Sequence, residues 1–134
     1  MNDMELIGAA ADAMKSAYAP YSGFFVGAAL LCESGEVYTG CNVENASYGA
    51  CNCAERTAVF KAVSEGKAKH KGIAIVGGKG GDITSFCAPC GICRQVMAEF
   101  AADDFFVLLY DGKKNEKLLL SELLPHSFTG KNLE

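Results

Sequence analysis

"ACNCAERTAVFKAV", residues 50–63, predicts a helix that carries reactive groups in its first turn. Apolar residues recur along it at helical spacing and predict one buried face: Ala54, Ala58, Val59, Ala62 and Val63. Cys53 stands at the predicted start, and Glu55 follows two residues later. A second cysteine pair lies in "APCGICRQ", residues 88–95, where another helix is predicted from about Cys90 to Phe100. These thiols could form a redox couple, a structural metal site or a catalytic metal site.

The remaining segments predict an α/β fold with one mixed sheet. An N-terminal helix has its apolar stripe at Leu6, Ala10, Ala13, Met14 and Ala17. A hairpin follows, with strands near 25–31 and 36–40 and a turn at Ser34–Gly35. Further strands are predicted at "GIAIVGG", "FFVLLY" and "EKLLL", and a short helix at "SELLP" with Ser121 as N-cap. Helices that alternate with apolar strands indicate a sheet covered by helices on both sides.

The length of 134 residues suits a single domain, residues 1–134. Half of the residues are apolar, which argues against disorder, and no apolar run is long enough to span a bilayer. The N-terminus, "MNDMELIG", carries acidic residues where a signal peptide would carry lysines. We therefore expect a cytoplasmic protein.

Charge and cysteine content narrow the possible partners. The formal net charge is -4, and the one close basic cluster, "KAKHK" at 67–71, is expected in a solvated surface loop. A protein that grips nucleic acid would usually carry more positive charge, so we expect a small neutral substrate and neither nucleic acid nor membrane as partner. In a reducing compartment, seven cysteines favour metal binding or catalysis over disulfides.

Three of the cysteines are predicted at helix N-termini, where partial positive charge favours the thiolate that binds metal. Cys90 and Cys93 are three residues apart, so one turn brings both sulfurs to one side. If the start of the other helix pointed at them, Cys53 would complete a set of three sulfurs suited to zinc. A structural site would need a fourth protein ligand, and the chain offers four candidates: Cys51, Cys87, His70 and His126.

Glu55 favours the catalytic alternative. A glutamate two residues after the first ligand, followed later by P-C-x-x-C, is the signature of zinc deaminases that act on cytosine or adenine. Two other interpretations remain open from the residues alone. With Asn52 as N-cap, Glu55 could complete a capping box. "CGIC" could also be a dithiol redox motif, although "CAE" would then have no explanation.

The sequence resembles the cytidine deaminase family, of the small homotetrameric type with an all-cysteine zinc site. The resemblance covers four stretches of the chain: "AYAPYSGFFVGAALL" (17–31), "GCNVENASYGACNCAERTAVFKAVSEG" (40–66), "APCGICRQ" (88–95) and "LLPHSF" (123–128). It implies a three-layer α/β/α sandwich around a five-stranded mixed sheet. It also implies a homotetrameric hydrolase of pyrimidine salvage, which converts cytidine, and deoxycytidine, to the uracil nucleoside and ammonia.

The resemblance further implies a role for each matching position. Cys53, Cys90 and Cys93 would hold one Zn²⁺ per chain, and Glu55 would carry protons between the attacking water, the base and the leaving ammonia. The expected substrate contacts are the following: Asn42 and Glu44 to the ribose 3′-hydroxyl, Phe24 against the pyrimidine ring, the Ala54 N–H to a base oxygen, the Ala88 carbonyl to the amino group, and Tyr48 and Phe128 in a neighbouring subunit's site.

Arg56 is expected beside the sulfurs, because three thiolates outweigh a divalent ion by one negative charge. A guanidinium that donates hydrogen bonds to them would reduce this excess. The other cysteines, Cys32, Cys41, Cys51 and Cys87, are expected to behave mainly as small apolar residues.

Three alternative functions remain open. A deaminase of polynucleotides is disfavoured by the acidic balance. A deaminase of a nucleoside antibiotic would share the zinc motifs but is not expected to have the full "CNVENASYG" stretch. A zinc-stabilised binding module would need a fourth protein ligand and would show no turnover.

Overall fold

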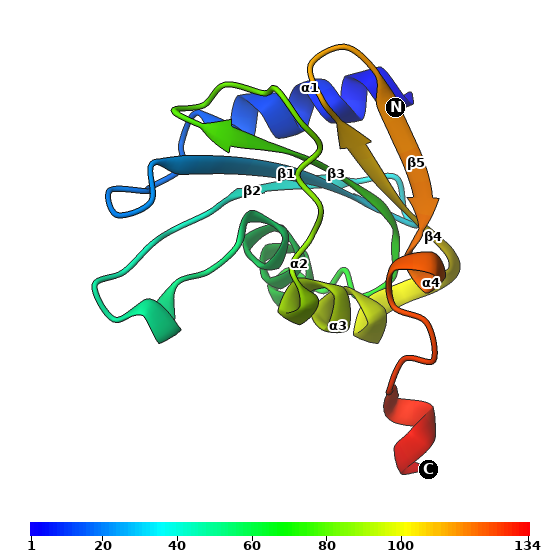
Figure 1. The fold of residues 1–134 in the computed structure, drawn as a ribbon. Coiled ribbons are helices and arrows are strands. Elements are labelled where there is room, and N and C mark those ends of the chain that lie inside the picture. The colour runs from blue at the N-terminus through cyan, green and yellow to red at the C-terminus, as the bar shows by residue number, and fades with distance from the viewer.

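A five-stranded sheet forms the middle layer of the computed structural model, which describes residues 1–134 (Figure 1). Its strand order is β2-β1-β3-β4-β5. The strands are β1 (Phe24–Cys32), β2 (Val37–Cys41), β3 (His70–Lys79), β4 (Ala101–Tyr110) and β5 (Asn115–Leu119). β3 and β4 are parallel, whereas every other neighbouring pair is antiparallel. The predicted mixed sheet is confirmed.

Helices cover both faces of the sheet. They are α1 (Asp3–Met14), α2 (Ala54–Ser64), α3 (Gly91–Phe100) and the short α4 (Leu120–Leu123), with 3₁₀ turns η1 (Tyr48–Ala50) and η2 (Gly130–Leu133). Figure 1 shows α1 on one face and α2 with α3 on the other. The predicted three-layer α/β/α sandwich is confirmed. None of these helices combines the length and the apolarity needed to cross a membrane.

The central strands are buried on both faces, and their side chains alternate between two cores. Ala28 and Leu30 of β1 join the core beneath α2 and α3, whereas Ala29 joins the core beneath α1. β3 alternates in the same way, with Ile73 and Ile75 on the first side and Ala74 on the second. This burial explains why "GIAIVGG" is a continuous apolar run.

The hairpin and the two helices that carry the cysteine motifs lie where the sequence predicts them. β1 pairs with β2 around the turn that contains Gly35. Ala54, Ala58, Val59 and Ala62 form the buried face of α2.

The predicted stripe of the N-terminal helix is wrong for Ala17. α1 ends at Met14, and Ile7 takes the further buried position. Tyr18 pairs with Val43, which lies in the segment that follows β2. The chain must therefore turn toward the edge of the sheet, and the helix cannot continue.

Two further local predictions are wrong. Ser121 is not an N-cap, since α4 begins at Leu120 and the Glu122 carboxylate accepts a hydrogen bond from the Leu119 N–H at 2.9 Å. The loop predicted at 67–71 ends early, because His70 pairs with Cys32 and Ala101 at the start of β3 and is fully buried. Tertiary pairing outweighs local polarity at this position.

Two glycines allow helices to lie directly on the sheet. A Cβ at Gly40 in β2 would lie 2.5 Å from the Ala54 carbonyl oxygen and 2.6 Å from the Ala58 nitrogen of α2. A Cβ at Gly27 in β1 would lie 2.0 Å from the Ala10 oxygen of α1. Atoms at such distances overlap, so only glycine permits this spacing. Gly40 therefore helps to fix the position of the α2 start.

We predict that Gly40→Ala destabilises the protein by about 1–3 kcal/mol, because α2 must move away from the sheet to accept the added methyl group. Urea unfolding measures this change. Gly8→Ala is the matched control: Gly8 lies in α1, and nothing stands within 4 Å of its added Cβ. We expect this control to stabilise the protein by about 0.5–1 kcal/mol. Equal stability of Gly40→Ala and the wild type would contradict the predicted clash.

Candidate active site

Cys53 occupies the N-cap position of α2, and its side chain makes no capping hydrogen bond. The sulfur is therefore free to face away from the helix. The preceding Asn52 does not cap this helix either: its amide donates to the Thr57 hydroxyl at 3.0 Å. The capping-box interpretation with Asn52 as N-cap is therefore wrong, and Glu55 is left without that role.

The second helix start brings two more sulfurs to the same place. Cys90 is the N-cap of α3, and its sulfur accepts a hydrogen bond from the Cys93 N–H at 3.4 Å. Cys93 is fully buried in the first turn. The sulfurs of Cys53, Cys90 and Cys93 all lie within 4.8 Å of one another. The two helix starts therefore meet, as the zinc hypothesis requires.

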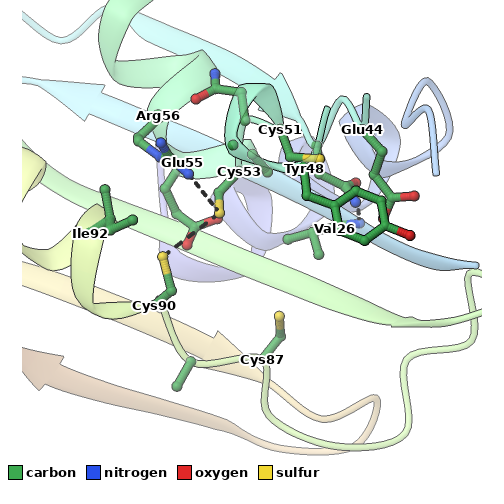
Figure 2. Close-up of a pocket in the computed structure, with 15 residues that line it drawn as sticks. Val26, Glu44, Tyr48, Cys51, Cys53, Glu55, Arg56, Cys87, Cys90 and Ile92 are labelled. Atoms are coloured by element: carbon green, nitrogen blue, oxygen red, sulfur yellow. Dashed lines mark hydrogen bonds between the residues drawn. The ribbon is translucent and has the colours of Figure 1, made fainter. Parts of the chain in front are cut away.

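This cluster fits a tetrahedral zinc ion. Zinc–sulfur bonds of about 2.3 Å at tetrahedral angles place two sulfurs about 3.8 Å apart. The Cys53 and Cys90 sulfurs are 3.7 Å apart (Figure 2). The cluster has three members, so it does not supply the fourth protein ligand of a closed site. The donor set therefore fits a zinc site that keeps one position open.

The other candidates for a fourth ligand have different contacts. Cys51 binds the loop that precedes it, since its sulfur accepts from the Asn45 N–H at 3.2 Å. His70 lies at the start of β3, and its Nε2 contacts the Lys67 carbonyl oxygen at 2.8 Å. Cys87 and His126 are not members of the cluster either. Burial raises the pKa of Cys87 to about 11, so its thiol is neutral at physiological pH.

Arg56 contacts the sulfur cluster as the charge argument expects. Its guanidinium donates to the Cys53 sulfur at 3.3 Å. Hydrogen bonds from Cys93 and from Arg56 lower the pKa of the Cys53 thiol. The hydrogen bond between Cys53 and Cys93, together with burial, raises the pKa of the Cys93 thiol. Negative charge on the Cys53 sulfur therefore lies next to the cation that offsets it.

Glu55 is a buried carboxylate beside the sulfurs. It is 4 % exposed and takes part in no salt bridge. Figure 2 shows its carboxylate next to the Cys53 sulfur, on the side of the cavity. Burial raises the pKa of Glu55 to about 7, and the Cys53 charge acts in the same direction. Such a carboxyl group can take up and release protons at neutral pH.

A cavity of about 450 Å³ opens beside Glu55, a volume in the range of small-molecule sites. Four of the five substrate contacts expected within one chain line it: Asn42, Glu44, Ala54 and Ala88. Tyr48, for which the resemblance implies a place in a neighbouring subunit's site, also lines the cavity of its own chain. Phe24 and Phe128 do not. Phe24 is the half-exposed first residue of β1, and Phe128 lies in the C-terminal segment. The single chain therefore assembles most of the predicted contact set.

Asn42 and Glu44 also organise the cavity wall. The Asn42 side chain accepts from the Val26 N–H and donates to the Phe24 carbonyl oxygen, each at 2.8 Å. One Glu44 oxygen accepts from the Tyr21 and Ser22 N–H groups, and the other accepts from the Ser22 hydroxyl. These bonds lower the pKa of Glu44 and fix both side chains at the edge of the cavity.

Sequence reasoning missed several residues of the wall as contacts: Val26, Gly49, Cys51, Asn52, Cys87 and Ile92. Val26 had a usable signal, because it is two residues after Phe24 on the same strand and therefore on the same side. Ile92 stands between the two cysteines of "CGIC". Cys87 was considered from its closeness to Cys90 in the sequence, but only as a metal ligand, whereas the structure places it in the cavity wall (Figure 2).

We predict that zinc is bound by three sulfurs and one light atom, because the cluster contains three cysteines. X-ray absorption at the zinc edge measures this ligand set. A second sample, the Cys87→Ser variant, should give the same spectrum, since Cys87 is outside the cluster. Four sulfur ligands in the wild type would instead indicate a closed structural site.

Similarity to known proteins agrees with this geometry. Residues 1–109 match the family model "Cytidine and deoxycytidylate deaminase zinc-binding region". Cytidine deaminase of Halalkalibacterium halodurans is 48% identical, over 99% of this chain and 98% of the relative. That of Sporosarcina psychrophila is 46% identical, over 99% and 96%. The crystal structure of cytidine deaminase from Burkholderia pseudomallei superposes with a TM-score of 0.87 at 46% identity, covering 96% of this chain and 100% of that one.

The matched region includes α2 and α3, whose first turns carry the three sulfurs and Glu55. On its sequence, its fold and the geometry of its metal cluster, the chain belongs to the zinc-dependent cytidine deaminase family.

Proposed function

We propose that this protein hydrolyses cytidine, and deoxycytidine, to the uracil nucleoside and ammonia, with one zinc ion per chain. The observation that carries the proposal is a buried carboxylate beside three cysteine sulfurs at the base of a cavity of nucleoside size. The similarity of the whole chain to cytidine deaminases supports cytidine as the substrate.

Cys53, Cys90 and Cys93 would hold the ion. A zinc ion in this position supplies Lewis acidity that makes water nucleophilic near neutral pH. Arg56 offsets the negative charge of the sulfurs through its contact with Cys53. Cys93 and Glu55 are buried, and the lower local dielectric around them strengthens their electrostatic contacts.

Glu55 would carry the protons of the reaction. Water adds to C4 of the cytosine ring while Glu55 takes a proton from it and gives that proton to N3. The new C4 hydroxyl then gives its proton to Glu55, which passes it to the amino group. The C4–N4 bond breaks, the C4 carbonyl forms, and ammonia leaves. One carboxylate can serve each transfer because it is buried at the cavity wall and has a pKa close to neutral.

The cavity wall would orient the nucleoside. Asn42 and Glu44 would bind the ribose 3′-hydroxyl with the hydrogen-bonding capacity that their contacts to β1 and to Tyr21–Ser22 leave free. The Ala54 N–H would donate to a base oxygen, and the Ala88 carbonyl would accept from the amino group. Phe24 would pack against the pyrimidine ring from the start of β1.

We infer that the active form is a homotetramer. Tyr48 is 73% exposed beside the cavity, and Phe128 is 59% exposed in the C-terminal segment. The Gln95 side chain of α3 donates a hydrogen bond to the Phe128 carbonyl oxygen at 2.8 Å, which ties the C-terminal segment to α3. Large exposed aromatic groups, one beside the cavity and one on the C-terminal segment, suit a self-complementary assembly in which neighbours complete the wall.

The remaining elements of the proposal come from composition and, for pyrimidine salvage, from the resemblance to cytidine deaminases. Residues 1–134 form one catalytic domain that acts on a small molecule in the cytoplasm, in pyrimidine salvage. The net charge of -4 and the isolated basic cluster at 67–71 support neither nucleic acid nor an anionic membrane as a partner.

Glu55→Gln tests the proton carrier. Turnover of cytidine should fall by at least about 10²–10⁴-fold, because the amide cannot exchange protons, while zinc content and melting temperature stay close to those of the wild type. The ultraviolet change from cytidine to uridine measures turnover. Glu65→Gln, at the exposed end of α2, is the matched control and should leave turnover unchanged. Retained turnover in Glu55→Gln would exclude this role for Glu55.

The assembly can be tested separately. Analytical ultracentrifugation at assay concentration should show a tetramer, and Phe128→Ala should raise KM and weaken association, because it removes a large apolar contact at the exposed segment. Ser34→Ala, in the hairpin turn, serves as the control. A fully active monomer would contradict the proposed assembly.

A further inference from the structure

Arg94 follows the zinc ligand Cys93 in α3, yet it contacts neither the sulfurs nor the cavity. Its half-buried guanidinium makes two well-formed hydrogen bonds. Nε donates to the Pro89 carbonyl oxygen, and a terminal nitrogen donates to the Leu123 carbonyl oxygen, each at 2.8 Å. One side chain therefore joins two segments that lie far apart in the sequence.

The first of these bonds fixes the loop directly before a metal ligand. Pro89 is fully buried and immediately precedes Cys90. A buried carbonyl needs a hydrogen-bond partner, and Arg94 provides it. The Arg94 backbone N–H also donates to the Cys90 carbonyl oxygen at 3.0 Å. Arg94 therefore holds two successive carbonyl groups, those of Pro89 and Cys90.

The second bond anchors this loop to α4. The Leu123 carbonyl is at the last position of that helix, where no intrahelical partner is available. A guanidinium suits both acceptors, because its N–H groups point in fixed, diverging directions. A lysine ammonium is more compact and reaches one carbonyl with less directional control.

We propose that Arg94 is a positioning residue for the zinc site, which holds the Pro89–Cys90 loop against α4 so that Cys90 keeps its distance from Cys53. Arg56 and Arg94 are the only arginines of the chain, and their tasks differ. Arg56 contacts a ligand sulfur. Arg94 acts on the backbone that carries two of the ligands.

The test measures metal binding directly in the purified protein. Arg94→Gln should weaken zinc affinity by about 10–100-fold in competition with a chromogenic chelator, the usual range for groups that support metal ligands. Cobalt substitution should show altered d–d bands, because the ligand geometry relaxes. Arg94→Lys should recover part of the affinity. Glu99→Gln, on the exposed side of the same helix, is the control and should match the wild type.

Two outcomes would overturn the proposal. The first is wild-type zinc affinity and an unchanged cobalt spectrum in Arg94→Gln, even if its melting temperature falls, since a purely structural contact would behave in this way. The second outcome applies if Arg94→Gln does not fold. In that case, wild-type zinc affinity in Arg94→Lys would overturn the proposal. These measurements use no nucleoside, so they stay informative if the protein binds zinc but does not deaminate cytidine.

Discussion

The site depends on the meeting of two helix starts on one side of the sheet. α2 and α3 begin next to each other, so the N-cap cysteine of each, with Cys93, brings three sulfurs within 4.8 Å. Helix N-termini stabilise the thiolates through unpaired N–H groups and the helix dipole. The close approach of α2 to β2, which only Gly40 permits, helps to set this geometry. The metal centre is therefore a consequence of how helices pack on the sheet.

Burial also gives the sulfur cluster a neighbouring carboxyl group with a raised pKa. Glu55 faces the sulfurs from the first turn of α2, and its side chain is buried. Desolvation raises its pKa, while Arg56 offsets the charge of the neighbouring thiolates. A carboxylate and a cation beside three sulfurs are costly to bury without a partner. Their placement around one cluster, at the wall of a cavity, is what connects this fold with proton transfer.

Local pattern was sufficient for many of the elements. The hairpin, α2, α3 and the apolar strand β3 lie where periodicity and turn residues predict them. The errors occur where long-range contacts take over. His70 leaves a polar segment to pair with Cys32 and Ala101, and α1 ends before Ala17 because Tyr18 pairs with Val43. Similarly, Asn52 bonds to Thr57 instead of capping α2, which a capping pattern alone cannot reveal.

The sequence by itself determined which residues could hold a metal, because three cysteines at predicted helix starts, two of them one turn apart, favour a sulfur-rich zinc site. With the resemblance to cytidine deaminases, it also indicated Glu55 and most of the cavity wall. Only the tertiary structure decided that Cys53 meets Cys90, that Cys51 and Cys87 stay outside the cluster, and that Arg94 ties the ligand loop to α4. The physical reason is that these relations depend on the placement of α2, α3 and α4 around one sheet, and no local spacing specifies distances between separate elements.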